Sequence, residues 1–312
     1  MSHENAQLSH DYGFLTQELL RLAPHAGKHP SSIPGLTFVR REDPARRESV
    51  FFSPSIGIVV QGCKNASIGA DEYSYQKGQY LLCCVDMPSS FIVDASPQSP
   101  LLTVSLQLDL ALFEEIFREM DADQGVSAVS GGHGASAHTG PERALRVSDI
   151  PPDMLHAVAR LARLADQPEK ARFIAPLLIR EIHYYLASGP NGDFLRSFFA
   201  PTSQSGQIAR AVTYMREHCN ERLRIERLAR MTNMAESTFN RNFKKVTSLS
   251  PLQYHKQLKL YEAKRLMLQE RMNAAQACTA VGYESQQQFT REYKRLFGTP
   301  PMRDVRQLSR AD

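Results

Sequence analysis

The sequence predicts an α+β protein with a β-rich N-terminal part and an all-helical C-terminal part. Three observations predict this fold: evenly spaced apolar runs over residues 36–108, a change in the sign of the charge near residue 200, and a pattern near the C-terminus that occurs twice. A chain of 312 residues is long enough for two hydrophobic cores. We therefore expect two domains, residues 1–200 and 201–312.

The first expected element is a short amphipathic helix over residues 11–23, capped by Asp11 and ended by Pro24. Short strand-like runs bounded by turn residues then fill residues 36–108: SIGIVV, YSYQ, QYLLCCV, SFIVDA and LLTVSLQL. Strands this short and this evenly spaced are typical of a small barrel or sandwich. Helical periodicity takes over at residues 109–120.

The segment between the strands and the basic third is predicted to be helical apart from one loop. Residues 121–141 are small and polar, which is typical of a mobile loop. Helices are expected near residues 152–166 and 170–188, and the second of these is apolar on more than one face. It is therefore buried or meets another helix or subunit. Residues 200–206 are typical of a linker.

The charge of the chain is divided unevenly. Residues 201–312 contain 20 lysines and arginines and 10 acidic residues, whereas residues 1–200 contain 17 and 23. A basic third indicates a polyanionic partner, although a solvated basic surface is the alternative. The sequence has no apolar stretch long enough for a membrane span and no secretory signal, and its five cysteines form no framework. We expect a cytoplasmic protein with reduced thiols.

The repeat in the basic third is the most informative pattern. Residues 237–251 (STFNRNFKKVTSLSP) match residues 287–301 (QQFTREYKRLFGTPP) at an offset of 50. Helical geometry places Phe239 and Phe243 on one face of the first copy, and equivalent aromatic residues occupy that face in the second. The opposite face of each copy carries hydroxyl, amide and cationic side chains. In sequence order these are Ser237, Asn240, Arg241 and Lys244, then Gln287, Thr290, Arg291 and Lys294, with Gln286 at the N-terminal edge.

Each copy follows another short helical segment, over residues 225–231 and 274–282, and a turn that contains Asn233 or Gly282. A short helix, a turn and a second helix with a polar outer face form a helix-turn-helix motif. The segment from residue 250 to 270 has helical periodicity without a breaker, with Ser250 as its cap. It is expected to form one long helix that holds the two motifs at a fixed separation.

These stretches resemble the DNA-binding domain of the AraC/XylS family of bacterial regulators, over residues 207–306. The resemblance assigns base reading to Ser237, Asn240, Arg241, Gln286, Gln287 and Arg291. Contacts to DNA phosphates are expected from Lys244, Lys245, Lys294 and Arg295. The family usually has serine where this chain has Ala235, so the first reading helix lacks its usual cap. The second has Ser285 and Gln288, which predict a capping box.

The N-terminal part resembles a branch of the same family that carries a cupin-like barrel, on FFSPSIGIVVQGCKNASIGADEYSYQKGQYLLCCVDMP and RFIAPLLIREIHYYLASGP. The implied architecture is a cupin-like β-barrel over about residues 36–108 with helices over about 109–200. The second domain is then all-α, with two helix-turn-helix motifs joined by a long helix. In such regulators the barrel commonly binds a small molecule, and adjoining helices often mediate dimerisation.

Other chemistries find little support in the sequence. The segment between His29 and His133 has no histidine, and His133 and His138 lie in the glycine- and serine-rich stretch, so no metal site or cofactor is expected. No catalytic motif occurs, so an enzyme is not expected. Two alternatives stay open. Cys83 and Cys84 are candidates for redox or electrophile sensing, against a role as buried apolar residues. The pairs Arg40-Arg41 and Arg46-Arg47 are solvated charges or, alternatively, recognise an acidic effector.

The function expected from the sequence is therefore that of a sequence-specific transcription regulator. Its partners are double-stranded promoter DNA and a small-molecule effector or chemical signal. RNA polymerase and a second copy of the chain are further candidate partners, and a membrane is not. The sequence leaves the effector, the target sequence and the sign of regulation open.

Overall fold

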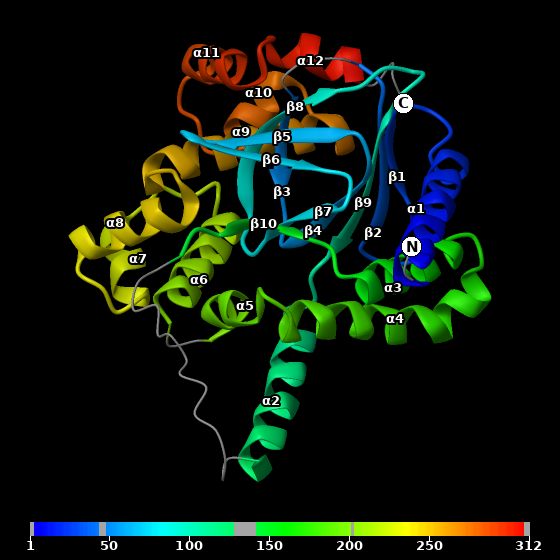
Figure 1. The fold of residues 1–312 in the computed structure, drawn as a ribbon. Helices are drawn as coiled ribbons and strands as arrows, with labels where there is room; N and C mark the ends of the chain where they lie inside the picture. Colours follow the sequence, from blue (N-terminus) through cyan, green and yellow to red (C-terminus); the bar gives the residue numbers. More distant parts are fainter. Residues whose placement is uncertain (1–2, 44–47, 128–141, 201–202, 309–312) are drawn as a thin grey trace.

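Two β-sheets form the centre of the computed structural model, and helices surround them (Figure 1). The structure describes residues 3–43, 48–127, 142–200 and 203–308. In the view of Figure 1, α1 lies to the right of the sheets, α3 and α4 lie below them, and the C-terminal helices lie above and to the left. Helix α2 projects away from the sheets. The DNA-binding half expected from the sequence therefore lies against the β-rich half.

Both sheets are antiparallel, and in neither does the spatial order of the strands follow their order in the sequence. One has six strands in the order β1-β2-β9-β4-β7-β10, and the other has four in the order β3-β8-β5-β6. The strands are β1 (Gly27–Pro30), β2 (Leu36–Arg41), β3 (Glu48–Phe52), β4 (Ser55–Gln61), β5 (Cys63–Ile68), β6 (Asp71–Gln76), β7 (Gln79–Cys83), β8 (Met87–Asp94), β9 (Leu101–Gln107) and β10 (Leu145–Asp149). No strand pairing joins the two sheets within the described residues, so they face each other as an open sandwich. The cupin-like α+β fold is confirmed, with open edges in place of a closed barrel.

The six-stranded sheet has two different faces because its side chains alternate along each strand. Phe38, Ile56 and Val104 are buried on the face that α1 covers. The alternate positions face the other sheet and carry small or polar side chains. These include Thr37, Ser55, Gly57, Thr103 and Ser105. Small side chains on this inner face leave space between the sheets.

The helices of the N-terminal half are α1 (His3–Leu22), α2 (Leu110–Ser127), α3 (Pro152–Arg163), α4 (Pro168–Ser188) and α5 (Gly192–Phe199). Helix α1 starts before Asp11, so Asp11 is not its cap; instead it is buried and pairs with His156, with 3.3 Å between Oδ2 and Nδ1. Helix α2 continues through residues 121–127, where a loop was expected. Residues 128–141, with His133 and His138, and Arg46-Arg47 lie outside the described residues.

The C-terminal helices are α6 (Gln204–Glu217), α7 (Ile225–Met231), α8 (Glu236–Thr247), α9 (Pro251–Gln269), α10 (Ala274–Ala280), α11 (Gln286–Phe297) and α12 (Pro301–Leu308). The expected linker is shorter than 200–206, because Ser203 caps α6 by accepting a hydrogen bond from the N–H of Gly206. Helix α9 is continuous, as predicted, and Ser250 forms a complete capping box with Gln253. The two helix-turn-helix units are therefore joined by one uninterrupted helix of 19 residues.

The two units belong to different hydrophobic cores. The aromatic residues of α8 are part of the large cluster that contains the cores of both sheets. The aromatic residues of α11 form a separate cluster with the C-terminal half of α9 and with α10. The first unit is thus continuous with the N-terminal half, whereas the second unit has its own core.

Candidate functional site

The first helix-turn-helix unit consists of α7, a turn and α8. Helix α8 packs through Phe239, Phe243 and Val246, all fully buried, with the two phenyl centroids 5.5 Å apart. Asn233 in the turn has a φ of 51°, a left-handed conformation that asparagine tolerates. Ala235 occupies the N-cap position with no side-chain hydrogen bond. As the sequence predicted, α8 therefore begins without a side-chain cap.

The second unit consists of α10, a turn one residue longer than the first, and α11. Ser285 caps α11, because its Oγ accepts a hydrogen bond of 3.3 Å from the N–H of Gln288. The other half of the predicted capping box is wrong: Gln288 donates its side-chain amide to Glu292, with 3.2 Å between Nε2 and Oε1. Tyr283 also donates to Glu292 at 2.8 Å. Burial opposes ionisation of Glu292, but these bonds and Lys256 outweigh it and lower its pKa.

The residues predicted to contact DNA are all exposed. They lie along the outer faces of α8 and α11, opposite the buried aromatic residues. None of them forms an ion pair within the described part of the chain, so their charges are available to phosphates. On α8 they are Ser237, Asn240, Arg241, Lys244 and Lys245, and on α11 they are Gln286, Gln287, Arg291, Lys294 and Arg295.

Asn240 differs from the other predicted base-reading residues. Its side-chain amide donates a hydrogen bond of 2.9 Å to the carbonyl of Glu236, one turn earlier on α8. The amide must leave this bond before it can pair with an adenine edge in the bidentate geometry. The sequence pattern does not reveal this bond, because a four-residue spacing permits it without requiring it.

Helix α9 connects the helix-turn-helix units to the β-sandwich through two tyrosines. Tyr254 and Tyr261 are seven residues apart and lie on one side of the helix. The hydroxyl of Tyr254 donates to the carbonyl of Asp86 at 2.8 Å, and that of Tyr261 donates to the carbonyl of Ser89 at 3.0 Å. Arg216 on α6 pairs with the carboxylate of Asp86 at 3.0 Å. Polar contacts therefore fix the β7–β8 segment and the start of β8 against α6 and α9.

Strand β3 contacts the second unit directly. Ser49 donates a hydrogen bond of 3.0 Å from its Oγ to the carbonyl of Leu296, in the last turn of α11. Phe51 packs on Tyr261, with 5.4 Å between the ring centroids. One strand of the sandwich thus touches both α9 and the second reading helix.

The turn between β5 and β6 lies against the C-terminal end of α8. Gly69 has a φ of 59°, and a Cβ there would lie 2.7 Å from the carbonyl oxygen of Ser248. Glycine is needed here for both its left-handed backbone and its lack of a side chain. The N–H of Ala144 also donates to the carbonyl of Val246 at 2.9 Å. The end of the first reading helix is therefore held by the backbone of the N-terminal half.

A cavity of about 320 Å³ lies between the two sheets. Its wall on the six-stranded sheet includes the small and polar inner-face residues described above together with the apolar Val39 and Leu81, and no carboxylate lines it among the described residues. The four-stranded sheet supplies aromatic rings and one lysine, namely Phe51, Phe52, Tyr75, Phe91 and Lys64. A partly apolar hollow of this size with a few polar groups is typical of a small-molecule site. The sequence did not reveal it.

Lys64 projects from β5 into this cavity. Its Nζ lies 4.1 Å from the centroid of the Phe91 ring and 5.5 Å from that of Phe52. It takes part in no ion pair or hydrogen bond among the residues that the structure describes. Burial lowers its pKa to about 7, and the nearby cations Arg41 and Lys28 act in the same direction. A lysine buried without a counter-ion is energetically costly unless a ligand supplies one.

The two adjacent cysteines lie in different surroundings, as the strand geometry predicted. Cys83 lines the cavity and donates from its Sγ to the carbonyl of Val85 at 3.1 Å, whereas Cys84 is not part of the cavity lining. Burial raises the pKa of the Cys83 thiol to about 12 and that of Cys84 well above its usual value. Both therefore stay protonated at neutral pH, which gives no support to thiol-based sensing. No group of three metal-binding side chains occurs among the described residues.

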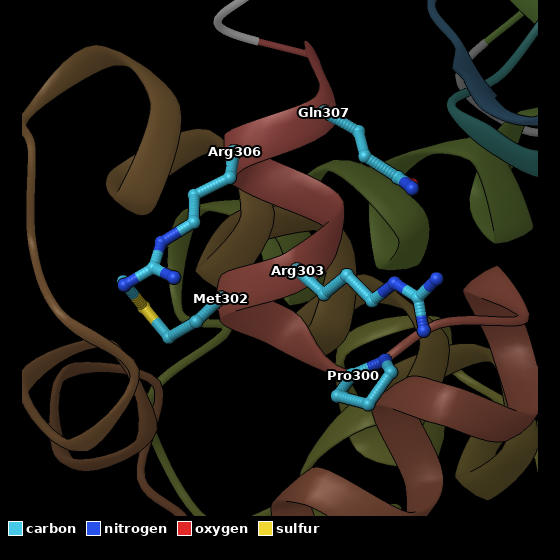
Figure 2. A pocket seen from close by; sticks show the side chains of 5 residues that line it. All are labelled: Pro300, Met302, Arg303, Arg306 and Gln307. Carbon is cyan, nitrogen blue, oxygen red and sulfur yellow. The ribbon is translucent and has the colours of Figure 1, made fainter.

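A larger hollow of about 570 Å³ lies along α12 and is lined by Pro300, Met302, Arg303, Arg306 and Gln307 (Figure 2). Met302 and Arg306 point to one side of the helix, whereas Arg303 points to the other (Figure 2). All five residues come from one short segment, so the hollow has no opposing wall. Such a surface does not enclose a small ligand. We therefore consider the cavity between the sheets the better candidate.

No helix within the described residues is long and apolar enough to cross a membrane.

Comparisons with known proteins agree with both halves of this description. A family model described as the N-terminus of AraC-type transcriptional regulators matches residues 32–194, and a helix-turn-helix domain model matches residues 228–307. The MmsAB operon regulatory protein of Pseudomonas aeruginosa is 34% identical over 88 residues, which cover 28% of this chain and 29% of that protein. The regulator ExsA of the same organism is 27% identical over 135 residues, 43% and 48% of the two chains. The matched segments thus span less than two thirds of these relatives.

A structural comparison finds solved structures that resemble most of the fold. ToxT from Vibrio cholerae, solved with an unsaturated fatty acid bound, superimposes with a TM-score of 0.57 at 9% identity and covers 90% of this chain and 97% of ToxT. A second ToxT structure, with (E)-4-(8-methylnaphthalen-1-yl)but-3-enoic acid bound, gives a TM-score of 0.58 at 8% identity and covers 86% and 97%. At this identity the likeness concerns the fold alone. The match over residues 32–194, together with the helix-turn-helix model over residues 228–307, shows that the chain belongs to the family of AraC-type transcriptional regulators.

Proposed function

We propose that the protein is a small-molecule-responsive regulator in which α8 and α11 read promoter DNA and the cavity between the sheets binds the effector. The boundary that we propose between the effector half and the DNA-binding half is residue 200. The single observation that carries the proposal is the position of β3. It supplies Val50, Phe51 and Phe52 to the cavity wall, and it contacts the second reading helix through Ser49. A ligand that moves this strand changes the surroundings of α11.

The DNA side of the proposal rests on exposed side chains with the right chemistry. Arginine pairs bidentately with guanine, and asparagine or glutamine pairs with adenine. We expect Arg291→Ala to cost about 1–3 kcal/mol at the cognate base and to relax specificity there. Lys244→Ala should weaken binding to all duplexes alike and reduce the dependence of affinity on salt. Equal losses of specific and random binding in Arg291→Ala, in a gel-shift titration, would remove the base-reading assignment.

The effector side is supported by the neighbour ToxT, whose structures hold acids as ligands. A ligand regulates only if it binds two conformations with different affinity, so DNA affinity must change when the cavity is occupied. The test measures DNA affinity of Ser49→Ala, which removes the bond to Leu296 without touching the reading faces. We expect a several-fold change, and none in Ser74→Ala, an exposed serine on β6. An unchanged affinity in Ser49→Ala would contradict the route through β3.

A second copy of the chain is the proposed partner of α4. This helix exposes several large apolar side chains on its surface: Phe173, Ile174, Leu177 and Tyr184. Contiguous exposed apolar surface is typical of an interface, which fits the predicted dimer. Sedimentation of Leu177→Glu beside wild type tests this; equal molecular masses for the two proteins contradict it.

We further propose that the protein activates transcription. The relative VirF from Yersinia enterocolitica, 24% identical over half of this chain and 58% of its own length, is named a transcriptional activator.

A further inference from the structure

The cavity between the sheets has an uneven distribution of charge and polarity. Lys64 projects into it from the four-stranded sheet, and Arg41 and Lys28 line it from neighbouring strands of the other sheet. The side chain of Arg41 is 14% exposed, while Lys28 is exposed, which places Lys28 at the mouth. The nearest carboxylate is that of Glu48, which pairs with Arg41 at 3.2 Å between Oε1 and Nε. Three cations therefore meet one carboxylate, and Lys64 is left without a partner of its own.

A second observation concerns Thr103 on β9. Its hydroxyl lines the cavity, is buried, and makes no hydrogen bond among the described residues. A buried hydroxyl without a partner costs free energy that a ligand with a hydrogen-bonding group recovers. The opposite wall consists of aromatic rings, with Phe91 buried under the Lys64 ammonium. The cavity thus offers a cationic group, a free hydroxyl and an apolar aromatic surface to one occupant.

We propose that the effector is a small organic acid whose carboxylate pairs with Lys64, with Arg41 and Lys28 contributing attraction from the side of the mouth. The apolar body of the acid packs on Phe52 and Phe91, and its polar edge reaches Thr103. This inference rests on the proposed function and names the chemical class of its effector. The volume of about 320 Å³ lies at the low end for ligand sites, which limits the acid to a few carbons or a single ring.

The chemistry of Lys64 gives the binding a pH dependence. Without ligand its pKa is about 7, and a carboxylate beside it stabilises the charged form, so binding takes up protons above that pH. The other charged or titratable groups that line the cavity are Tyr75, Cys83, Lys28 and Arg41. Burial raises the pKa of Tyr75 and Cys83, so both stay neutral, whereas partial desolvation and the nearby Arg41 lower the pKa of Lys28. Affinity for the acid is therefore expected to fall as the pH rises from 7 to 9.

The experiment compares carboxylates with their neutral amides on the full-length protein. Benzoate, benzamide, hexanoate and hexanamide are titrated up to tens of millimolar, with thermal shift and calorimetry as readouts. We expect the acids to bind at least tenfold more tightly than the amides, with more proton uptake at pH 8 than at pH 6. Lys64→Met should abolish this preference, and Lys170→Met, an exposed lysine on α4, should keep it.

The outcomes separate this inference from the proposed function. Equal binding of acids and amides to wild type, or an acid preference that survives in Lys64→Met, would overturn the assignment of an acidic effector. If Lys64→Met does not fold, Thr103→Val and Lys64→Arg test the same site, since the first should weaken the acids and the second should retain their advantage over the amides. Acids that bind through Lys64 without changing DNA affinity would leave the acid site standing and contradict the small-molecule-responsive function. Amides that change DNA affinity would support the small-molecule-responsive function and contradict the acidic effector.

Discussion

The two helix-turn-helix units share a pattern but are stabilised in different ways. The first begins its reading helix at Ala235 without a side-chain cap and ends it at Ser248, which adopts a left-handed φ of 61°. The second begins at Ser285 with a cap and ends at Gly298, where a φ of 80° costs little. The first unit has the poorer helix ends, yet its aromatic residues belong to the core of the sandwich. Packing on the N-terminal half therefore stabilises a helix whose ends are poorly capped.

The same repeated pattern therefore forms one unit that is stabilised by its own core and one that is stabilised by the core of the sandwich. The second unit has its own core and its own buried network around Glu292. The core of the first unit is continuous with that of the sandwich, so destabilising the sandwich should lower the stability of the first unit more than that of the second.

The largest expected effect comes from truncating the central aromatic residue of each unit. Phe239→Ala and Phe289→Ala each remove a fully buried ring and should cost about 3–5 kcal/mol. Phe239→Ala should lower the stability of the whole chain, because its core includes the sandwich. Phe289→Ala should loosen α10 to α12 and leave the sandwich folded. Urea unfolding with hydrogen exchange of both regions distinguishes them, and identical exchange patterns in the two variants would refute separate cores.

Mild acid should weaken the first unit before the second. His255 on α9 is buried, and desolvation together with Lys259 lowers its pKa to about 4 from the usual 6.5. A lowered pKa means that the unfolded chain takes up the proton first, so stability is present above pH 6.5 and lost as the pH falls toward 4. By pH 5 the loss is on the order of 2 kcal/mol. Glu292, whose pKa is lowered from 4.5, contributes stability until the pH falls below that value.

Urea unfolding at pH 7, 6 and 5 measures this loss, with His255→Leu as the control. The variant has no titrating group at this position, so its stability should change less over the same interval. A variant that loses as much stability as wild type would show that other groups carry the acid response.

Gly69 and Gly298 both have a positive φ, so alanine substitutions at the two positions distinguish backbone strain from the contact with Ser248. Gly69→Ala and Gly298→Ala both place a Cβ on a left-handed residue, which costs about 1–2 kcal/mol. At Gly298 nothing lies within 4 Å of that Cβ, whereas at Gly69 the Ser248 carbonyl must move. Gly69→Ala should therefore cost more and should increase hydrogen exchange at the end of α8. Equal costs with unchanged exchange would mean that this contact is not tight in solution.

The smallest effect expected is that of exchanging the helix caps. Ala235→Ser supplies the missing cap of α8 and should stabilise the first unit by about 1 kcal/mol, and Ser285→Ala should destabilise the second by a similar amount. Thermal unfolding measures both changes, with DNA affinity as a second readout. A destabilised Ala235→Ser variant would show that the N-terminal turn of α8 has no room for the hydroxyl.

Much of the helical half could be predicted from the sequence because its signals are local. Phe239 and Phe243 repeat as Phe289 and Tyr293, and caps such as Ser250 stand next to the helices they start. Strands β1 and β10 could not be predicted in this way. The first contains Pro30 and has no buried residue. The second pairs with β7, from which β8, β9 and α2 separate it in the sequence. A short window of sequence does not show which strands pair when they are this far apart in the chain.

The cavity was missed for a different reason. Thr37, Ser55 and Thr103 alternate with apolar residues along their strands, as they would on a solvent-facing sheet. The pattern identifies one polar face without showing that a second sheet covers it. Arg41 is accordingly predicted to be a solvated charge, and only the packing of the two sheets places Arg41 and Lys64 at the cavity between them. Recognition of an acidic effector was an alternative for Arg41, and it became arguable only with this burial.

The continuous helix α9 has a consequence for the operator. A rod of 19 residues spans about 28 Å, and capping at Ser250 together with its hydrogen-bonded interior leaves it no hinge. Under the proposed function, the reading helices at its two ends meet the duplex with fixed phase as well as fixed distance. Half a turn of extra DNA between their two sub-sites would move the second one to the opposite side of the double helix. The length of the spacer is then part of what the protein recognises, although no side chain touches it.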